Sequence, residues 1–349
     1  MTNWKTYKLG DILNFRRGHD LPKTEMADGD IPVAGSNGII GYHNIATPIE
    51  PCITIGRSGN VGTPYIYDKC WAHNTVLYID DFKGNDPLYL YYLLKTIPLA
   101  SYGGGSAVPT LNRNHIHPIE ILHTPSLEEQ RRIAGILGAI DDKIENNRRI
   151  NDNLEQQAQA LYKQWFVDNR NKDWETLTLD DVAAISAGGD KPQVCSEQKT
   201  QECNIPIYSN SIDREGLYGY TNNPRIIENS ITISARGTIG YVCLRTEPYV
   251  PIVRLISVIP THDNMSAYFL YLWALTQNIS GTGTTQQQLT VPAFRTTQIV
   301  VPSQEILIRF NKVVKPIFDC IKQNKVENET LATIRDTLLP KLMNGEIKL

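Results

Sequence analysis

The sequence lacks the features that define several large classes of protein. It contains no run of roughly eighteen or more apolar residues, so we expect no segment that spans a membrane. The opening residues, Met-Thr-Asn-Trp-Lys, have no apolar signal core, which predicts a cytoplasmic protein. Six cysteines, among them Cys52 and Cys70, are scattered without any Cys-x-x-Cys pair. This pattern favours reduced thiols rather than a disulfide framework.

The short motifs of common enzymes are also missing. No Gly-x-x-x-x-Gly-Lys-Ser/Thr loop and no Gly-x-Ser-x-Gly turn occurs. Asn85-Asp86-Pro87-Leu88 lacks the tandem proline and the aromatic residue of a methyltransferase motif, and instead predicts a helix start with proline at its first position. His115-x-His117 has no cysteine or carboxylate to complete a metal site, so we expect a solvated loop pair. We interpret Asp80-Asp81-x-Lys83 as a turn after a strand and Gly103-Gly104-Gly105 as a hinge loop, although the triple glycine could also cradle a phosphate. The sequence therefore predicts no catalytic residue and no metal ligand.

Net charge gives no sign of a nucleic-acid-binding protein. The chain has 34 basic and 37 acidic residues and a formal charge of −3. Residues 1–125 contain 10 basic and 11 acidic groups, and residues 169–302 contain 10 and 12. If the chain binds DNA, a local basic cluster or a basic partner must therefore supply the phosphate contacts.

Two long amphipathic segments, residues 126–168 and 303–349, dominate the rest of the chain. Apolar residues recur at steps of four and three in both, which is the pattern of a coiled-coil seam, and both seams carry a pair of asparagines at the same place. The segments could be two unrelated surface helices, but the shared register favours helices that pack on each other. Arg335 is the one break in the apolar match. The predicted pairing residues are Ile133, Leu137, Ile140, Ile144, Asn147, Asn151, Leu154, Leu161, Phe310, Val314, Ile317, Ile321, Asn324, Asn328, Leu331 and Leu338.

Two local features refine these helices. Ser126 followed three residues later by Glu129 predicts a capping box at the start of the first helix. Pro316 is expected to bend the second helix or split it, because proline has no backbone N–H and its ring clashes with the preceding turn.

The remaining segments repeat one plan. The strand and glycine turn of residues 53–62 recur at residues 231–240, and each segment contains short strands followed by a small helix. The sequence thus predicts an α+β fold with two duplicated mixed α/β domains, separated by a long antiparallel two-helix coiled coil and related by a pseudo-two-fold axis. The predicted segments are residues 1–125, 126–168, 169–302 and 303–349.

Polar, planar and aromatic side chains collect on the loops of both repeats. Arginine pairs with guanine edges and asparagine or glutamine with adenine edges, while hydroxyl groups and the N–H groups of glycine turns suit phosphates. Each such residue could instead be a turn former bonded to its own backbone. The candidate DNA-binding residues are Arg16, Arg17, Ser36, Asn37, Tyr42, Asn44, Arg57, Ser58, Asn60, His73, Asn74, Asn112, Arg113, Ser209, Asn210, Arg214, Tyr220, Arg236, Thr238, Gln287 and Thr290.

Several stretches together resemble one known family. They are residues 53–62, residues 109–113, Pro-Ser-Leu-Glu-Glu-Gln-Arg-Arg-Ile at 125–133, residues 154–167, and Leu-Leu-Pro-Lys-Leu-Met-Asn-Gly-Glu-Ile at 338–347. The chain resembles the DNA-specificity subunits of type I restriction–modification systems over nearly its whole length. It departs from the family at Gln304-Glu305-Ile306-Leu307, where the usual Glu-Gln pair is missing.

The resemblance implies a non-catalytic reader of double-stranded DNA with a bipartite target. Each repeat would be a target recognition domain for one half-site, and the paired helices would set the gap. The helices would also dock two modification subunits, which resemble adenine methyltransferases that use S-adenosylmethionine, and restriction subunits would join the complex. The chain itself would bind no cofactor. The alternative is a structural adaptor that tethers partners and binds protein or carbohydrate; a self-sufficient methyltransferase or nuclease is disfavoured by the missing motifs.

Overall fold

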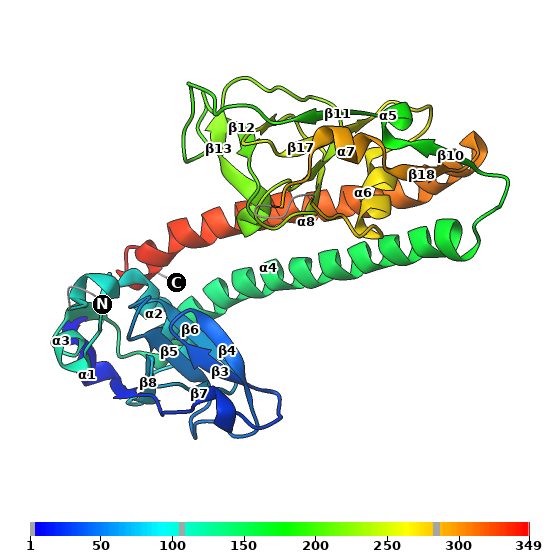
Figure 1. The fold of residues 1–349 in the computed structure, drawn as a ribbon. Coiled ribbons are helices and arrows are strands. Elements are labelled where there is room, and N and C mark those ends of the chain that lie inside the picture. Colours follow the sequence, from blue (N-terminus) through cyan, green and yellow to red (C-terminus); the bar gives the residue numbers. More distant parts are fainter. Residues whose placement is uncertain (1–3, 105–108, 282–286, 348) are drawn as a thin grey trace. The chain divides into compact units, whose positions relative to one another are not determined.

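The computed structural model describes residues 4–104, 109–281, 287–347 and 349. The chain forms two compact units (Figure 1). Unit 1 comprises Met1–Asn147 and Val326–Leu349, and unit 2 comprises Arg148–Lys325. Both boundaries fall inside long helices, α4 (Leu127–Tyr162) and α8 (Gln304–Met343). The division into four segments at residues 125, 168 and 302 stays a prediction.

The described residues of unit 1 form three small sheets. The strand β1 (Lys5–Lys8) pairs antiparallel with β9 (Glu120–His123). A four-stranded sheet has the order β2-β8-β5-β6, with bounds Asn14–Arg17, Val76–Asp81, Cys52–Gly56 and Pro64–Tyr67. A three-stranded sheet has the order β4-β3-β7, with bounds Gly38–His43, Ile31–Gly35 and Trp71–Ala72. The short helices are α1 (Leu9–Ile12), α2 (Pro87–Thr96) and α3 (Arg113–Ile116).

Unit 2 repeats this plan sheet for sheet. Here β10 (Glu175–Thr178) pairs antiparallel with β18 (Gln298–Val301). The four-stranded sheet is β11-β17-β14-β15, with bounds Ala183–Ala187, Ile256–Pro260, Ser230–Ile233 and Val242–Arg245. The three-stranded sheet is β13-β12-β16, with bounds Leu217–Thr221, Ile205–Tyr208 and Val250–Pro251. The helices are α5 (Leu179–Val182), α6 (Ala267–Leu275) and α7 (Val291–Arg295). The predicted duplication of a mixed α/β domain is confirmed.

Each unit includes a stretch of α4 and of α8 in its own hydrophobic core. In unit 1, Ile133 and Leu137 of α4 and Leu342 of α8 are buried with strand residues such as Phe15 and Ile53. An amphipathic helix must bury its apolar stripe, and the strands offer the matching apolar face. The long helices are therefore structural parts of both units rather than simple connectors.

Aromatic side chains fill the corresponding core of unit 2. Phe310 of α8 is fully buried, and its ring centroid lies 4.7 Å from that of Phe166 and 6.2 Å from that of Tyr162. Phe269 of α6 packs edge-to-face on Phe166, with centroids 5.1 Å apart. Such edge-to-face pairs stabilise a core beyond the area they bury.

Asparagines on the seam face each other in both units. In unit 1 the Asn147 amide is almost fully buried and donates hydrogen bonds to Asn328 Oδ1 (2.9 Å) and Glu327 Oε2 (2.7 Å). In unit 2 the Asn324 amide donates to Asn151 Oδ1 at 2.8 Å. Residue numbers rise along α4 while they fall along α8, so the predicted antiparallel pairing is confirmed within each unit.

Arg335, the break in the apolar seam, has a polar partner. Its Nη1 donates to Asp141 Oδ1 at 2.7 Å, and the Tyr92 hydroxyl of α2 donates to Asp141 Oδ2 at 2.8 Å. Both charged side chains are about three-quarters buried. At this position an ion pair between Arg335 and Asp141 replaces the apolar contact of the seam. The pair avoids the cost of a buried guanidinium group without a partner.

Two expectations about the helices need correction. α8 runs unbroken across Pro316, so the predicted split does not occur; Pro316 is exposed, and water can satisfy the carbonyl whose helical partner is missing. At the start of α4, the Glu129 N–H donates to Ser126 Oγ at 3.3 Å, as a cap requires. The Glu129 carboxylate, however, accepts from Trp4 Nε1 (2.9 Å) and Thr124 Oγ1 (2.7 Å). The reciprocal half of the predicted capping box is therefore wrong.

Other local predictions hold. α2 starts with Pro87, and Asp86 accepts a hydrogen bond from the Tyr89 N–H at 2.9 Å. The Lys83 N–H donates to Asp81 Oδ1 at 2.7 Å in the turn after β8. Part of the hinge predicted around Gly103 lies outside the described residues, since 105–108 are not described, and the same applies to residues 282–286 of unit 2.

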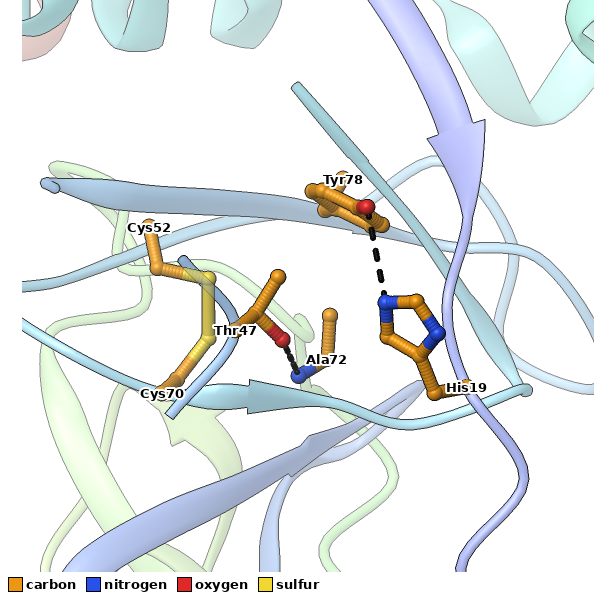
Figure 2. Close-up of a disulfide and its surroundings, with 6 residues drawn as sticks. All are labelled: His19, Thr47, Cys52, Cys70, Ala72 and Tyr78. Atoms are coloured by element: carbon orange, nitrogen blue, oxygen red, sulfur yellow. Dashed lines mark hydrogen bonds between the residues drawn. A yellow bond between two sulfur atoms is a disulfide. The ribbon is translucent and has the colours of Figure 1, made fainter. Parts of the chain in front are cut away.

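Cys52 and Cys70 form a disulfide, as Figure 2 shows. Cys52 lies on β5 of the four-stranded sheet, and Cys70 immediately precedes β7 of the three-stranded sheet. Nearby, the Ala72 N–H donates to Thr47 Oγ1 at 2.9 Å. The expectation that all six thiols are reduced is wrong for this pair, because the tertiary fold brings two distant β segments together. The other four cysteines are free.

We predict that Phe310→Ala destabilises unit 2 by about 3–5 kcal/mol, because it removes a fully buried ring from an aromatic cluster. Ile308→Ala is the matched control on the same helix, since Ile308 is 41% exposed. Urea denaturation followed by tryptophan fluorescence measures both. Equal unfolding midpoints for the two variants would contradict the assigned packing.

Candidate nucleic-acid interface

Five of the predicted DNA-binding residues of unit 1 line one hollow. Its volume is about 390 Å³. The lining side chains include four arginines and one asparagine from three separate segments of the chain. The lining residues are Arg16, Arg17, Arg57, Leu77, Thr110, Leu111, Asn112 and Arg113.

The strand pairing explains why these segments meet. Arg16 and Arg17 lie on β2, which pairs with Tyr78 and Leu77 of β8. Arg57 follows β5, the other neighbour of β8, and its N–H donates to the Thr75 carbonyl at 2.8 Å. The segment before α3 joins them because the Leu111 N–H donates to the Arg57 carbonyl at 2.8 Å. The arginines are thus far apart in sequence but share one end of the sheet.

Positive charge is concentrated at this hollow. Residues 1–125 contain four arginines, and all four line it. Arg17 forms an exposed ion pair with Asp20, with Nη2 and Oδ1 3.4 Å apart. Among the described residues, no carboxylate lies within salt-bridge distance of Arg16, Arg57 or Arg113. The hollow is therefore suited to an anionic or strongly accepting ligand.

Asn74 connects two of the arginines. Its backbone carbonyl accepts a hydrogen bond from Arg57 Nη1 at 3.3 Å, and its side-chain amide donates to Asp20. The Asn74 hydrogen bond, assisted by the nearby Arg17 charge, holds the pKa of Asp20 below its ordinary value. Asp20 thus stays ionised and orients Arg17 beside the hollow.

Ser36 and His73 support the loops rather than line the hollow. The Ser36 hydroxyl is buried, 2.7 Å from the Ser58 carbonyl and 2.6 Å from that of Thr75. His73 Nδ1 lies 3.0 Å from Thr75 Oγ1, and burial lowers the pKa of His73, which favours its neutral ring. Both residues fix the segment that carries Arg57.

The other candidates of unit 1 do not line this hollow. Tyr42 is 55% exposed on β4, which is the edge of the three-stranded sheet. Their role in binding stays a prediction. These residues are Asn37, Tyr42, Asn44, Ser58 and Asn60.

Three candidates of unit 2 form hydrogen bonds within that unit. The Asn210 amide donates to the Val253 carbonyl at 2.6 Å, and its oxygen accepts from the Ala235 N–H at 2.7 Å. Arg236 Nη2 donates to Gln288 Oε1 at 3.1 Å. Ser209 Oγ donates weakly to the Gly216 carbonyl at 3.4 Å. These contacts give Asn210 and Ser209 structural roles, whereas Arg236 is exposed on its turn.

The remaining candidates of unit 2 are dispersed. Arg214 has a positive φ of 46° and lies 3.7 Å from Asp213 Oδ2. Thr290 precedes α7 as its N-cap residue without a side-chain cap bond. Tyr220 lies on β13, and Thr238 and Gln287 are exposed. Base contact by any of them stays a prediction.

Sequence reasoning missed the residues that arrange the arginines. Asp20 lies three residues after Arg17 and could have been found from that spacing. Thr75 had no such signal, because its carbonyl and hydroxyl act only through residues brought near by the fold.

His115 and His117 do not form a solvated loop pair. His115 lies within α3, and His117 Nε2 accepts a hydrogen bond from the Phe15 N–H at 3.1 Å. Within the described ranges, no three His, Cys, Asp or Glu side chains are placed to hold a metal ion. Nor does any helix in the described part of the chain have the length and apolar character needed to cross a membrane.

Comparison with known proteins identifies the class. The family described as "Type I restriction modification DNA specificity domain" matches residues 1–156 and again residues 171–335. The two matches fall on the two repeats, as the duplicated fold requires. The chain belongs to this family of type I DNA-specificity subunits.

Individual relatives agree. The specificity subunit of the type I restriction enzyme MjaIX of Methanocaldococcus jannaschii is 32% identical over 301 residues, covering 74% of this chain and 69% of the relative. The HindI specificity subunit of Haemophilus influenzae is 28% identical over 317 residues, covering 65% and 69%. The crystal structure of a type I S subunit from Mycoplasma genitalium shares the fold, with a TM-score of 0.65 at 19% identity over 98% of this chain and 96% of that one.

We predict that Asn74→Ala raises the pKa of Asp20 toward its ordinary value, because the largest stabilisation of the carboxylate is removed. Carboxyl titration by NMR measures this shift. Asp181 of unit 2 is the internal control: its pKa is lowered by hydrogen bonds from Thr178 and should not change. An unaltered Asp20 pKa would show that the link between Arg17 and Arg57 does not form in solution.

Proposed function

We propose that this chain reads a bipartite DNA sequence for a type I restriction–modification complex and is not itself catalytic. The observation that carries the proposal is the arginine-lined hollow on a member of the DNA-specificity family. Arginine recognises both phosphate oxygens and guanine edges, the two acceptor groups that DNA presents. The near-neutral net charge of the chain is compatible with DNA binding, because the arginines that would contact DNA are concentrated at the hollow.

Each unit would read one half-site. The two units share sheet topology while their loop residues differ, as expected when one scaffold serves two sequences. The glycine turns support the proposal that the two units recognise different half-sites. The turn with Arg57 in unit 1 and the turn with Arg236 in unit 2 carry different side chains at equivalent positions.

The long helices would set the distance between the half-sites. α8 has 40 residues, which at about 1.5 Å per residue corresponds to roughly 60 Å. The Asn147–Asn328 and Asn151–Asn324 pairs specify one register of α4 against α8. A seam with one favoured register makes a fixed spacer.

Partners would supply the chemistry. We propose that two modification subunits, each an adenine methyltransferase using S-adenosylmethionine, dock on this chain, and that restriction subunits complete the assembly. A base must leave the duplex before it can be methylated, and the sequence of this chain contains no Asn-Pro-Pro-aromatic methyltransferase motif. Its role would be to position the methyltransferases on one sequence.

We predict that DNA treated with this chain and the methyltransferase encoded beside it carries methyladenine within one motif of two short defined halves around a fixed gap. Base-resolution methylation mapping measures this, with the methyltransferase alone as control. An assembled complex that neither methylates nor binds DNA at any salt concentration would overturn the proposal and favour an adaptor role.

We also predict that replacing Asn147, Asn151, Asn324 and Asn328 together by leucine preserves or raises stability but widens the range of accepted gaps. Leucines pack a seam without the pairwise requirement of buried amides. The control is Asn146→Leu with Asn153→Leu, two exposed asparagines on α4. Methylation of a library of gap lengths measures tolerance, and an unchanged gap preference in the fourfold variant would count against the proposed spacer.

A further inference from the structure

The arginines of the unit 1 hollow have uncharged counterparts in unit 2. Strand register shows which residues of β2 and β11 correspond. In unit 1, Arg16 and Thr54 both pair with Tyr78 of β8. In unit 2, Ser186 and Thr232 both pair with Ser257 of β17. Thr54 and Thr232 occupy equivalent places on the central strands β5 and β14. The next residues, Arg17 and Ala187, correspond in the same way.

Backbone hydrogen bonds give the correspondence for the other two arginines. The Leu111 N–H donates to the Arg57 carbonyl, and the Leu289 N–H donates to the Ala235 carbonyl, at 2.8 and 3.0 Å. The short helices α3 and α7 begin two residues later in each unit. The four pairs of counterparts are Arg16 and Ser186, Arg17 and Ala187, Arg57 and Ala235, and Arg113 and Val291.

Two arginines of unit 2, Arg245 and Arg295, have partners within the fold or at its surface. Arg245 is 97% buried, and its guanidinium carbon lies 3.5 Å from the Tyr208 ring centroid. Its Nη2 donates to the Glu215 carbonyl at 2.6 Å. Arg295 donates to the Ile185 carbonyl at 3.1 Å, and its Nε lies 3.2 Å from Asp180 Oδ1. Arg113 of unit 1 also donates to a strand carbonyl, that of Phe15 at 3.3 Å, but of Arg113 and Arg295 only Arg295 has a carboxylate beside it among the described residues. Arg236, next to Ala235, is exposed and donates to the neutral Gln288, so one charge without a carboxylate partner in the described part of the chain remains on this turn of unit 2.

We propose that the unit 1 hollow holds backbone phosphates of DNA and that the described residues of unit 2 form no equivalent cluster of four arginines, so the two half-sites are held with unequal electrostatic strength. The proposal rests on the function proposed above. It names the chemical group that the hollow recognises and assigns it to one unit.

Charge repulsion favours phosphate over a base edge. Four guanidinium groups around one hollow repel one another, and only Arg17 has a carboxylate partner among the described residues. A guanine edge offers two acceptor atoms and no net charge, so it would engage one arginine and leave the repulsion uncompensated. Phosphate oxygens carry the opposite charge and suit several arginines at once.

Salt dependence tests the charge. Each phosphate contact contributes a slope of about −0.9 to log K against log salt concentration. We predict that Arg16→Gln lowers the magnitude of the slope by about 1 for the complex with its methyltransferase, and weakens specific and non-specific DNA alike. Arg16 is exposed on β2, so the substitution should leave the fold intact. Lys69→Gln is the charge-matched control: Lys69 is a half-exposed cation of unit 1 that pairs with Glu50 and does not line the hollow.

Adding charge to unit 2 gives the converse test. Ser186 and Ala187 are exposed, so Ser186→Arg with Ala187→Arg should steepen the slope by creating the missing contact. This variant also keeps the proposal testable if an arginine substitution in unit 1 disturbs folding.

Neutral phosphates locate the site. Single methylphosphonate substitutions, each of which removes the charge of one phosphate, are placed in turn through both halves of the mapped target. Those at contacted phosphates should weaken binding of the unaltered chain. At the one or two phosphates that Arg16 contacts, the substitution should not weaken binding of the Arg16→Gln variant any further, and we expect these phosphates in one half of the target only. Coupled positions in both halves, or a loss confined to one guanine, or a Lys69→Gln effect as large as that of Arg16→Gln would overturn the proposal. In each of these cases the target would still be bound, whereas failure of the proposed function would remove target binding altogether.

Discussion

The pairing of asparagines between α4 and α8 is the constraint on which the structure depends. An amide that is buried without a partner is costly, so the buried Asn147 must meet Asn328, and the partly buried Asn151 and Asn324 pair in the same way. This requirement selects one register and the antiparallel direction, which apolar residues alone specify weakly. The apolar positions on either side then enter the cores of the two units, and the strands pack on them. The four amide side chains thus favour one register of α4 against α8 within each unit.

The duplicated scaffold separates stability from recognition. Equivalent strands have the same order in both units, and the central strands β5 and β14 are buried from end to end. The loops at the ends of these strands tolerate different side chains, because they are not needed to fill the core. An exposed position on an edge strand can likewise hold Arg16 in unit 1 and Ser186 in unit 2. Divergence at such positions gives two surfaces of different charge without altering the fold.

The site in unit 1 shows how an almost neutral chain can present a basic surface. The 10 basic and 11 acidic residues of 1–125 nearly cancel, yet all four arginines face one hollow. Asp20 and Asn74 hold part of this cluster in place, and the Asn74 hydrogen bond keeps the pKa of the Asp20 carboxylate low. Specificity and affinity then depend on where charges lie rather than on how many there are.

The sequence alone determined what periodicity and repetition can express: two long helices with a shared asparagine break, two copies of one α/β plan, and the family to which both belong. Chemical type also marked the arginines as candidates, because a guanidinium group suits both phosphates and guanine edges. Only the tertiary structure decided which candidates meet, since Arg16, Arg57 and Arg113 are brought together by strand order and by hydrogen bonds between distant segments. It likewise decided that Ser36 and Asn210 hold loops, that Cys52 joins Cys70, and that Glu129 binds Trp4 rather than capping its own helix. The local sequence pattern does not show how close two residues far apart in the chain lie in space. These contacts depend on that closeness, so only the tertiary structure reveals them.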